Sequence, residues 1–281
     1  MKIDVIICAY NAHKYIKKAI NSIIKQSIID KIKITIVDDG SNYDYEDIIS
    51  NYSENIKLIT LKKNKGIGSA RQVGLKNTFN EYVMFIDSDD EFYSDTAVEK
   101  LYNVISKNND VDVVEGKINS TSGIIENPFT YLHGKMYRRS FIDKNNIDFL
   151  DLKISEDTAF NLAISASGAN RKQIEDIIYF YNKNIKDSIT DTITNRVEIL
   201  KSVLIACDYA YKKTKDYNVF INSITNIYEQ FINNFINKKN FKTENDLIIY
   251  AKLCKNFYKK YKKYIINTDY IKAYKNVFEV F

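Results

Sequence analysis

The chain has 281 residues, of which 45% are hydrophobic and 27% are charged, a composition typical of a folded globular protein with a sizeable core. No apolar run approaches the ~18 residues needed to span a membrane, and the N-terminus lacks the apolar core of a signal peptide. The net charge of +5 is mild, and three scattered cysteines form neither a metal-binding spacing nor a disulfide framework. We therefore expect a cytoplasmic protein, with anionic partners favoured but not identified.

Short apolar strands and helical segments alternate over the first 115 residues. We expect strands over residues 3–9, 32–37, 56–61, 82–86 and 111–115, and helices over residues 15–24, 44–52, 66–79 and 94–106. This alternation predicts an α/β fold in which helices flank a mostly parallel sheet. Ligands of such sheets bind outside the carboxyl ends of the strands.

Polar residues follow four of these strands, at the point where each strand ends. They are Asn11, the pair Asp38 and Asp39, the pair Asn64 and Lys65, and the acids Asp87 and Asp89. Because parallel strands end at the same edge of a sheet, we expect these four segments to line one cleft.

The strand at residues 82–86 leads directly into three carboxylates, Asp87, Asp89 and Asp90. On an extended backbone, residues two apart face the same side, so Asp87 and Asp89 can converge while Ser88 points away. Two crowded anions are unfavourable unless a cation lies between them, and oxygen ligands suit Mg²⁺ or Mn²⁺. The stretch therefore predicts a divalent metal site, although a lone Asp-x-Asp would indicate only an acidic turn.

Beyond about residue 116 the alternation stops. Residues 117–136, which include the only proline, Pro128, are expected to form irregular strands and loops. The remaining pattern predicts a helix over 155–166, a strand over 174–181 and helices near 197–206, 219–236 and 247–264. Residues 187–281 are therefore expected to form a C-terminal helical appendage rich in Lys and Tyr.

The expected cleft has the side chains that a nucleoside diphosphate needs. Asp39 can accept a hydrogen bond from a base N–H, and Arg71 supplies a charge-assisted fork for carboxylate or phosphate. A metal on Asp89 would neutralise the diphosphate and make it a better leaving group. These residues predict a site from which a diphosphate departs.

Six stretches also resemble the motifs of family 2 glycosyltransferases, and they stand in that family's order and spacing. They are Val5–Asn11, Val37–Ser41, Asn64–Arg71, Phe85–Asp90, His133–Arg139 and Ser155–Asp157. The resemblance covers residues 1–181. It implies a GT-A fold, a nucleotide-sugar donor, a divalent metal (Mn²⁺ or Mg²⁺) and inversion at the anomeric carbon.

The resemblance implies roles around the donor nucleotide. Asp39 would hold the nucleobase, with Cys8 and Tyr10 beside it, and Arg71 would stabilise the base-binding acid or the diphosphate. Cys8 stands where the family commonly has proline or threonine, a difference expected to alter packing more than chemistry. The same expected substrate site includes Asn11, Lys65 and Ser88.

For the metal, the resemblance makes Asp89 a ligand and Asp87 either a contact of the ribose or part of the metal shell. His133 occupies a position that is often tryptophan in the family. It could be a third metal ligand, a donor to the departing phosphate, or an ordinary polar loop residue, since imidazole suits each role.

On the acceptor side, Asp157 matches the family's general base, which takes the proton of the acceptor hydroxyl, and Glu156 is expected to cap the helix and orient Asp157. Lys135 and Arg138 are expected to face phosphates. The predicted division is a catalytic domain over residues 1–186, with a nucleotide-sugar half (1–115) and an acceptor half (116–186), followed by the helical region.

The predicted activity is transfer of a hexosyl or N-acetylhexosaminyl group from a UDP-sugar to a hydroxyl of a cell-surface glycan, polymer or other anionic acceptor. One alternative is a non-catalytic module that binds nucleotide sugar or glycan. Another is a haloacid-dehalogenase-type phosphohydrolase, because Phe85–Asp89 also fits an apolar strand with Asp-x-Asp. That class has its nucleophile on the first strand, whereas this cluster follows the fourth.

In the run Tyr258–Tyr264, pairs of lysines separate single tyrosines. Such a run is most often a solvated helix face, but it could also contact an anionic polymer, a nucleic-acid acceptor or a membrane surface. A peripheral position at the inner face of the membrane would then follow.

Overall fold

The computed structural model describes residues 2–52, 56–121, 123–125, 130–182, 195–237, 241–274 and 277–278. The chain divides into two compact units. The first comprises Met1–Asp157 with Ala169–Ile185, and the second comprises Thr158–Gly168 with Lys186–Phe281. The second unit thus includes the predicted helical region together with a short internal segment. The functional division at residue 186 stays a prediction.

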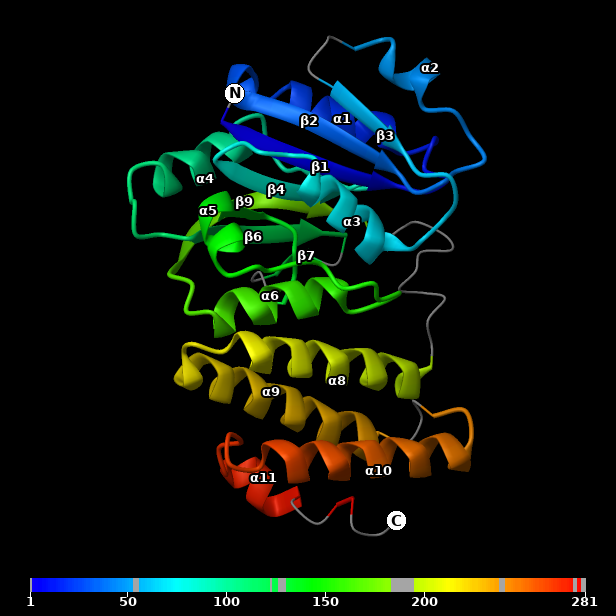
Figure 1. Cartoon of the computed structure of the whole chain (residues 1–281), viewed down its shortest axis with the longest axis vertical. Coiled ribbons are helices and arrows are strands. Elements are labelled where there is room, and N and C mark those ends of the chain that lie inside the picture. The colour runs from blue at the N-terminus through cyan, green and yellow to red at the C-terminus, as the bar shows by residue number, and fades with distance from the viewer. Residues whose placement is uncertain are drawn as a thin grey trace. The chain divides into compact units, whose positions relative to one another are not determined.

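The first unit is built on one mixed sheet (Figure 1). Its strands are β1 (Ile3–Ala9), β2 (Ile32–Asp38), β3 (Ile56–Thr60), β4 (Tyr82–Asp87), β5 (Glu91–Phe92), β6 (Val113–Ser120), β7 (Gly123–Ile125), β8 (Lys135–Arg138) and β9 (Arg171–Tyr181). Their order is β3-β2-β1-β4-β8-β6-β9-β5, with β7 paired with β6. Strands β3, β2, β1 and β4 are parallel, whereas β8 is antiparallel to both β4 and β6.

The strands β1, β2 and β4 end level with one another. Cys8 of β1 lies opposite Val37 of β2 on one side and Asp87 of β4 on the other. Strand β1 is rich in Ile and is buried over its whole length, as expected for a strand covered on both faces. The polar residues that follow these strands therefore come to one edge of the sheet, as the sequence predicts.

Helices complete the first unit. They are α1 (Ile16–Ile24), α2 (Glu46–Ile49), α3 (Ile67–Lys76), α4 (Ala97–Ile105), α5 (Arg139–Lys144) and the first two residues of α6 (Glu156–Ala166). The predicted start of the fourth helix at Ser94 is wrong, because α4 begins at Ala97 after Thr96. The Ser94 carbonyl instead accepts a hydrogen bond from the Gln26 side chain at 2.7 Å.

Residues 117–136, which the sequence predicts to be irregular strands and loops, contain regular strands where the structure describes them. Strand β6 continues to Ser120, and β7 forms a hairpin with it in which Ser120 lies opposite Gly123. Strand β8 then begins at Lys135. Pro128 lies outside the described residues.

The second unit is helical. Its helices are α8 (Arg196–Lys213), α9 (Tyr217–Ile236), α10 (Glu244–Tyr261) and α11 (Asp269–Tyr274), together with most of α6. Side chains of Asn195, Asp216 and Thr243 accept hydrogen bonds from the first turns of α8, α9 and α10, and so act as N-caps. Among the described helices, none is both long and apolar enough to cross a membrane.

The three cysteines are all buried and unpaired. Cys8 belongs to the sheet, and Cys207 and Cys254 lie in α8 and α10. Burial raises the pKa of each thiol, to about 12 for Cys8. All three are therefore neutral side chains near neutral pH, and they pack as small hydrophobic groups.

Candidate active site

The turn after β2 uses two aspartates to hold backbone groups. Asp38 accepts a hydrogen bond from the Ser41 N–H at 3.0 Å, as expected of a turn residue. The two carboxylate oxygens of Asp39 accept from the backbone N–H groups of Lys65 and Gly66, each at 2.8 Å. Asp39 thus fixes the loop that enters α3, where Gly66 has a φ of 92°. Each oxygen has a second acceptor site, so the nucleobase contact of Asp39 stays a prediction.

The segment after β1 lies at the same edge. Tyr10 is 50% exposed. Asn11 links this segment to the next turn, because its backbone N–H donates to Ser41 Oγ at 2.8 Å and its side-chain oxygen accepts from the Asn42 N–H at 3.0 Å. Asn11 has a φ of 51°, a conformation that asparagine tolerates better than most residues. Tyr10 presents a ring to solvent, whereas Asn11 holds two loops together.

Arg71 joins two carboxylates that are 69 positions apart in the sequence, Asp87 and Glu156. Its guanidinium contacts Asp87 Oδ1 at 2.7 Å and Glu156 Oε1, and it is only 4% exposed. Although burial opposes the charged form of Arg71, the two acids raise its pKa. The ion-pair partners of Arg71 are thus Asp87 and Glu156 and not the base-binding acid Asp39, and the alternative that Arg71 stabilises the diphosphate stays a prediction.

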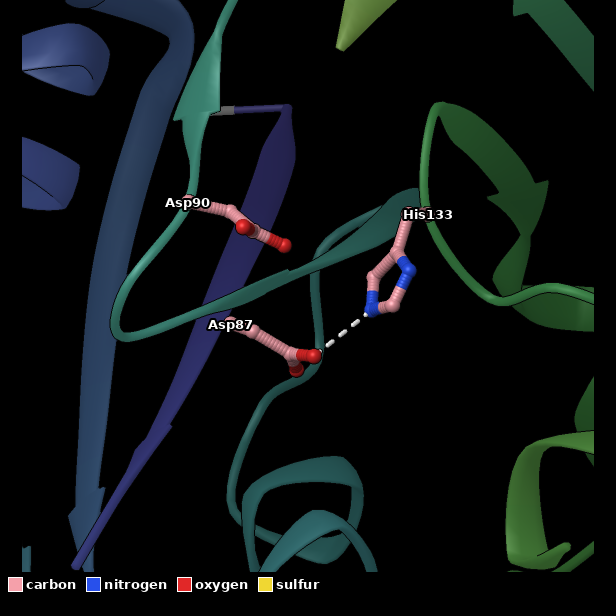
Figure 2. A group of neighbouring side chains, drawn as sticks. All are labelled: Asp87, Asp90 and His133. Atoms are coloured by element: carbon pink, nitrogen blue, oxygen red, sulfur yellow. Dashed lines mark ion pairs between the residues drawn. The ribbon is translucent and has the colours of Figure 1, made fainter. Parts of the chain in front are cut away.

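Three potential metal ligands meet at the end of β4. Asp87, Asp90 and His133 each offer one ligand atom, and these atoms lie within 4.8 Å of one another (Figure 2). His133 Nε2 lies 2.9 Å from Asp87 Oδ2, and the two side chains point toward each other. Burial raises the pKa of Asp90 to about 7, with the Asp87 charge adding to the effect. Two carboxylate oxygens and one imidazole nitrogen in a partly buried acidic site fit a divalent cation.

Asp89 lies outside this group of three. Burial and the neighbouring Asp87 raise the pKa of Asp89 to about 6. A cation would lower that pKa by favouring the carboxylate. Ser88, between the two acids, is half-buried. The role of Asp89 as the main metal ligand stays a prediction, and the structure adds Asp90 as a further candidate.

Tyr179 of β9 contacts all three members of the group. Its hydroxyl accepts from the Asp87 backbone N–H at 3.1 Å and donates to Asp90 Oδ2 at 2.7 Å. Its ring stacks on His133 with centroids 4.9 Å apart. The backbone N–H of Asn182 donates to the other Asp90 oxygen at 2.8 Å. Strand β9 therefore positions the acidic end of β4, a role that the sequence of this strand does not reveal.

Asp157 follows Glu156 in the first turn of α6 and is half-buried. Ser155, just before the helix, has a φ of 62°. Because Arg71 holds both Glu156 and Asp87, it ties the start of α6 to the end of β4 within the first unit. Glu156 thus fixes the helix start through Arg71, which is compatible with its predicted task of orienting Asp157.

Lys135 forms a buried ion pair. Its Nζ lies 3.2 Å from Glu115 Oε2, which Arg171 also contacts at 2.6 Å. Lys135 is fully buried, and burial lowers its pKa to about 7. Glu115 and Lys135 are opposite each other in the β6–β8 pairing. The ion pair with Glu115 thus explains how the charged Lys135 side chain is accommodated in the sheet. A contact of Lys135 with phosphates stays a prediction.

Arg138 does not lie where the sequence predicts. In the β4–β8 pairing it stands opposite Tyr82, the first residue of β4, and so at the other end of that strand from Asp87. Its guanidinium donates to the carbonyls of Ile105, Asn108 and Val111 at 2.9–3.0 Å. Arg138 therefore holds the end of α4, away from the site, and the prediction that it faces phosphates there is wrong.

Lys65 contributes its backbone to the site through Asp39, and its side chain is exposed. A contact of the Lys65 ammonium with substrate stays a prediction.

The chain is similar to glycosyltransferases both in sequence and in structure. The sequence profile called Glycosyl transferase family 2 matches residues 4–167. The poly(ribitol-phosphate) beta-N-acetylglucosaminyltransferase TarP of Staphylococcus aureus is 32% identical over 219 residues, which cover 69% of this chain and 67% of TarP. A poly(ribitol-phosphate) beta-glucosyltransferase of Bacillus spizizenii is 27% identical over 205 residues, 64% of this chain but only 32% of that protein.

Solved structures match the whole chain. The crystal structure of S. aureus TarS 1-349 in complex with UDP-GlcNAc superposes with a TM-score of 0.80 at 18% identity, covering 100% of this chain and 88% of that one. The mannosyltransferase PcManGT of Pyrobaculum calidifontis, in complex with GDP-Man and Mn²⁺, gives a TM-score of 0.65 at 14% identity over 99% and 87% of the two chains. The predicted GT-A fold with C-terminal helices is confirmed.

Proposed function

This chain belongs to glycosyltransferase family 2, and from that premise we propose that it transfers a sugar from a nucleoside-diphosphate sugar to an acceptor hydroxyl with inversion. The ion pairs of Arg71 carry the proposal. They bring the acidic end of β4, suited to a metal and a diphosphate, to the start of α6, where Asp157 follows Glu156. The proposed leaving-group site and the proposed base therefore belong to the same unit.

The proposed reaction is a single displacement. The acceptor oxygen forms a bond to the anomeric carbon while the bond from that carbon to the diphosphate oxygen breaks, and the acceptor proton passes to Asp157. Asp87, Asp90 and His133, with Asp89 beside them, would hold the divalent metal. When bound, the metal would neutralise charge on the leaving diphosphate.

We propose a UDP-sugar as donor and a polyol-phosphate polymer as acceptor. The support is that TarP and the B. spizizenii relative are both named as poly(ribitol-phosphate) transferases, and that a UDP-GlcNAc complex is among the matching structures. A cytoplasmic site of action, peripheral at the inner face of the membrane, is part of the same proposal. The GT-A fold sets aside the phosphohydrolase alternative, because that class has its nucleophile on the first strand.

Two measurements test the function. In a thermal-shift panel of UDP- and GDP-sugars with and without Mn²⁺, the true donor at ~100 times its Kd should stabilise the protein by ~2.7 kcal/mol. In the second measurement, transfer to poly(ribitol phosphate) is monitored through the release of the nucleotide. Absence of any donor binding or turnover would overturn the proposal, and donor binding without turnover would support the non-catalytic module.

The base is tested by Asp157→Asn. We expect transfer to fall by ~10²–10⁴-fold while donor binding is kept, because only proton transfer is removed. Asp30→Asn is the matched control, since Asp30 is an exposed acid just before the start of β2, at the opposite end of the sheet from the site. Unchanged transfer in Asp157→Asn would show that another group is the base.

A further inference from the structure

The positive charge of this protein is concentrated in its helical part. Residues 186–281 contain 17 Lys and Arg against 10 Asp and Glu, a net charge of +7, whereas residues 1–185 contain 24 against 26, a net charge of −2. A field of one sign on one part of a chain attracts anionic partners to that part. The acidic donor site and the basic region are thus on different units.

Lysines gather where α8 and α10 end. The two helix ends are adjacent, because Lys260 pairs with Asp208 of α8 at 2.6 Å and the Tyr211 and Tyr264 hydroxyls are 3.2 Å apart. Six exposed lysines belong to these ends and the residues just after them: Lys212, Lys215, Lys259, Lys260, Lys262 and Lys263. The helix macrodipole favours cations in a last turn, but Lys215 and Lys263 lie beyond the helices.

Two tyrosine rings are stacked beside these lysines. Tyr217, at the start of α9, is 49% exposed and stacks on Tyr264 with centroids 5.7 Å apart and planes 19° apart. Lys263 Nζ lies 4.7 Å from the centre of the Tyr264 ring. Tyr211 and Phe220 support Tyr264 from within the unit, with centroids 5.6 and 5.7 Å away. An exposed Tyr217 ring stacked on a half-buried Tyr264 ring, with packed rings behind it, is a preformed flat surface.

We propose that this Lys/Tyr surface, formed by the six lysines with Tyr217 and Tyr264, is an accessory binding site for a polyol-phosphate polymer, the acceptor of the proposed function on which this inference rests. Ammonium groups bind phosphates as point charges. The C–H faces of a polyol or sugar can lie on the stacked rings. One polymer chain has many phosphates, so a second site on the same protein keeps it bound between transfers by raising its effective concentration.

The test is direct binding of poly(glycerol phosphate) and poly(ribitol phosphate) to the full chain, measured by calorimetry at several salt concentrations. In the triple variant Lys259→Gln, Lys262→Gln, Lys263→Gln, we expect ~10-fold weaker binding and a salt slope reduced by ~2, since each phosphate contact contributes ~0.7 to the slope. Tyr217→Ala should weaken binding without changing the slope.

Each control variant loses the same number of lysines, or the same number of aromatic rings, as the variant that it is compared with. The triple variant Lys201→Gln, Lys242→Gln, Lys252→Gln changes three exposed lysines elsewhere in the second unit, and Tyr274→Ala removes another exposed ring. Equal losses in the controls would overturn the inference, because net charge alone would then explain binding. Stronger binding to vesicles with anionic lipid than to either polymer, lost in the same variants, would also overturn it in favour of a membrane surface.

Donor hydrolysis in the same variants separates this inference from the proposed function. We expect it to be unchanged, which also shows that the variants fold. Polymer binding through this surface in a protein that turns over no nucleotide sugar would refute the proposed function and leave the binding site standing. Normal turnover of nucleotide sugar, with equal polymer binding in all variants, would support the proposed function and refute the accessory binding site.

Discussion

Asp87 has a side-chain partner on each of its two carboxylate oxygens. Arg71 contacts one of its oxygens at 2.7 Å and His133 contacts the other at 2.9 Å. Burial opposes ionisation, but His133 and Arg71 lower the pKa of Asp87 well below its usual range. The side chain is therefore held as a carboxylate in a fixed orientation, which preorganises the site for a cation.

The hydroxyl of Tyr179 is expected to matter for that preorganisation. Tyr179→Phe leaves Asp90 without one donor and the Asp87 N–H without its acceptor, which should cost ~1–3 kcal/mol of stability. We also expect ~10-fold weaker Mn²⁺ binding, as for other groups that orient ligands. Chemical denaturation and Mn²⁺ titration of the protein, without substrate, measure the two effects.

The control for this variant is Tyr82→Phe. Tyr82 is also buried and its hydroxyl also donates to an acid, Glu81, but it lies at the other end of β4. Loss of stability in both variants with Mn²⁺ affinity unchanged in both would show that Tyr179 has a structural role only.

Glu115 gives a pH-dependent contribution to stability. Arg171 and Lys135 outweigh burial and lower the pKa of Glu115 below its usual value of 4.5. The stabilisation is therefore complete above pH 4.5 and is lost as the pH falls through the lower, folded-state pKa. Glu115→Gln should cost ~3 kcal/mol at pH 7, because Lys135 and Arg171 lose their counter-charge, and the difference from wild type should shrink below pH 4.5.

Urea denaturation from pH 7 to pH 3 measures this difference, with Glu46→Gln as a control on an exposed acid of α2. A constant difference across that range would contradict the assigned ion pairs.

The sequence motifs point to most residues of the candidate site, but not to the contacts between them. Asp87, His133, Arg71 and Glu156 are all recognisable from their motifs. That Arg71 bridges two of them depends on how α3 is rotated and where α6 begins, which no local pattern contains. Asp90 resembles an ordinary turn acid until its burial is known.

At the scale of elements, α3 is the connector of the site. It begins after the loop that Asp39 holds, and it carries Arg71 in its second turn. The strands β1 to β4 were predictable because each is an apolar run that ends in polar residues. The short strands β5, β7 and β8 were not, because their pairing with distant strands, and not their own sequence, defines them.

Gly68 permits the close approach of α3 to the segment before α6. A Cβ atom at this position would lie 2.2 Å from the Leu150 carbonyl oxygen and 3.2 Å from Glu156 Cβ. Gly→Ala within a helix usually stabilises by ~0.5–1 kcal/mol, but here the clash is with backbone and should dominate. Gly68→Ala is expected to destabilise by ~1–3 kcal/mol and to lower transfer through the displaced Glu156.

Thermal denaturation and transfer assays check this prediction, with Lys76→Ala on the exposed side of α3 as the control. A stabilised Gly68→Ala variant would show that the segment at Leu150 moves without cost.

At the scale of the whole molecule, α6 belongs to the packing of the second unit although its first residues belong to the first. Every residue from Ala159 to Ala166 is buried. The Ala166 carbonyl accepts hydrogen bonds from the backbone N–H groups of Lys215 and Asp216 at 2.7 and 3.1 Å. The helix that carries Asp157 therefore requires the C-terminal region.

Truncation after Lys186 is accordingly expected to yield a poorly folded protein, because it uncovers the apolar side chains of α6. Circular dichroism and size-exclusion chromatography of the truncated chain measure this. Soluble, folded protein that hydrolyses donor would instead show that the helical region serves only the acceptor.

The three buried thiols give each unit its own reporter of opening. A neutral, inaccessible thiol does not react with alkylating reagents until the surrounding structure opens. The rate of Cys8 alkylation therefore reports how fast the sheet opens. The rates of Cys207 and Cys254 alkylation report how fast the helices open. Mass spectrometry of pulse-labelled wild-type protein can thus compare the unfolding of the two units without any engineered probe.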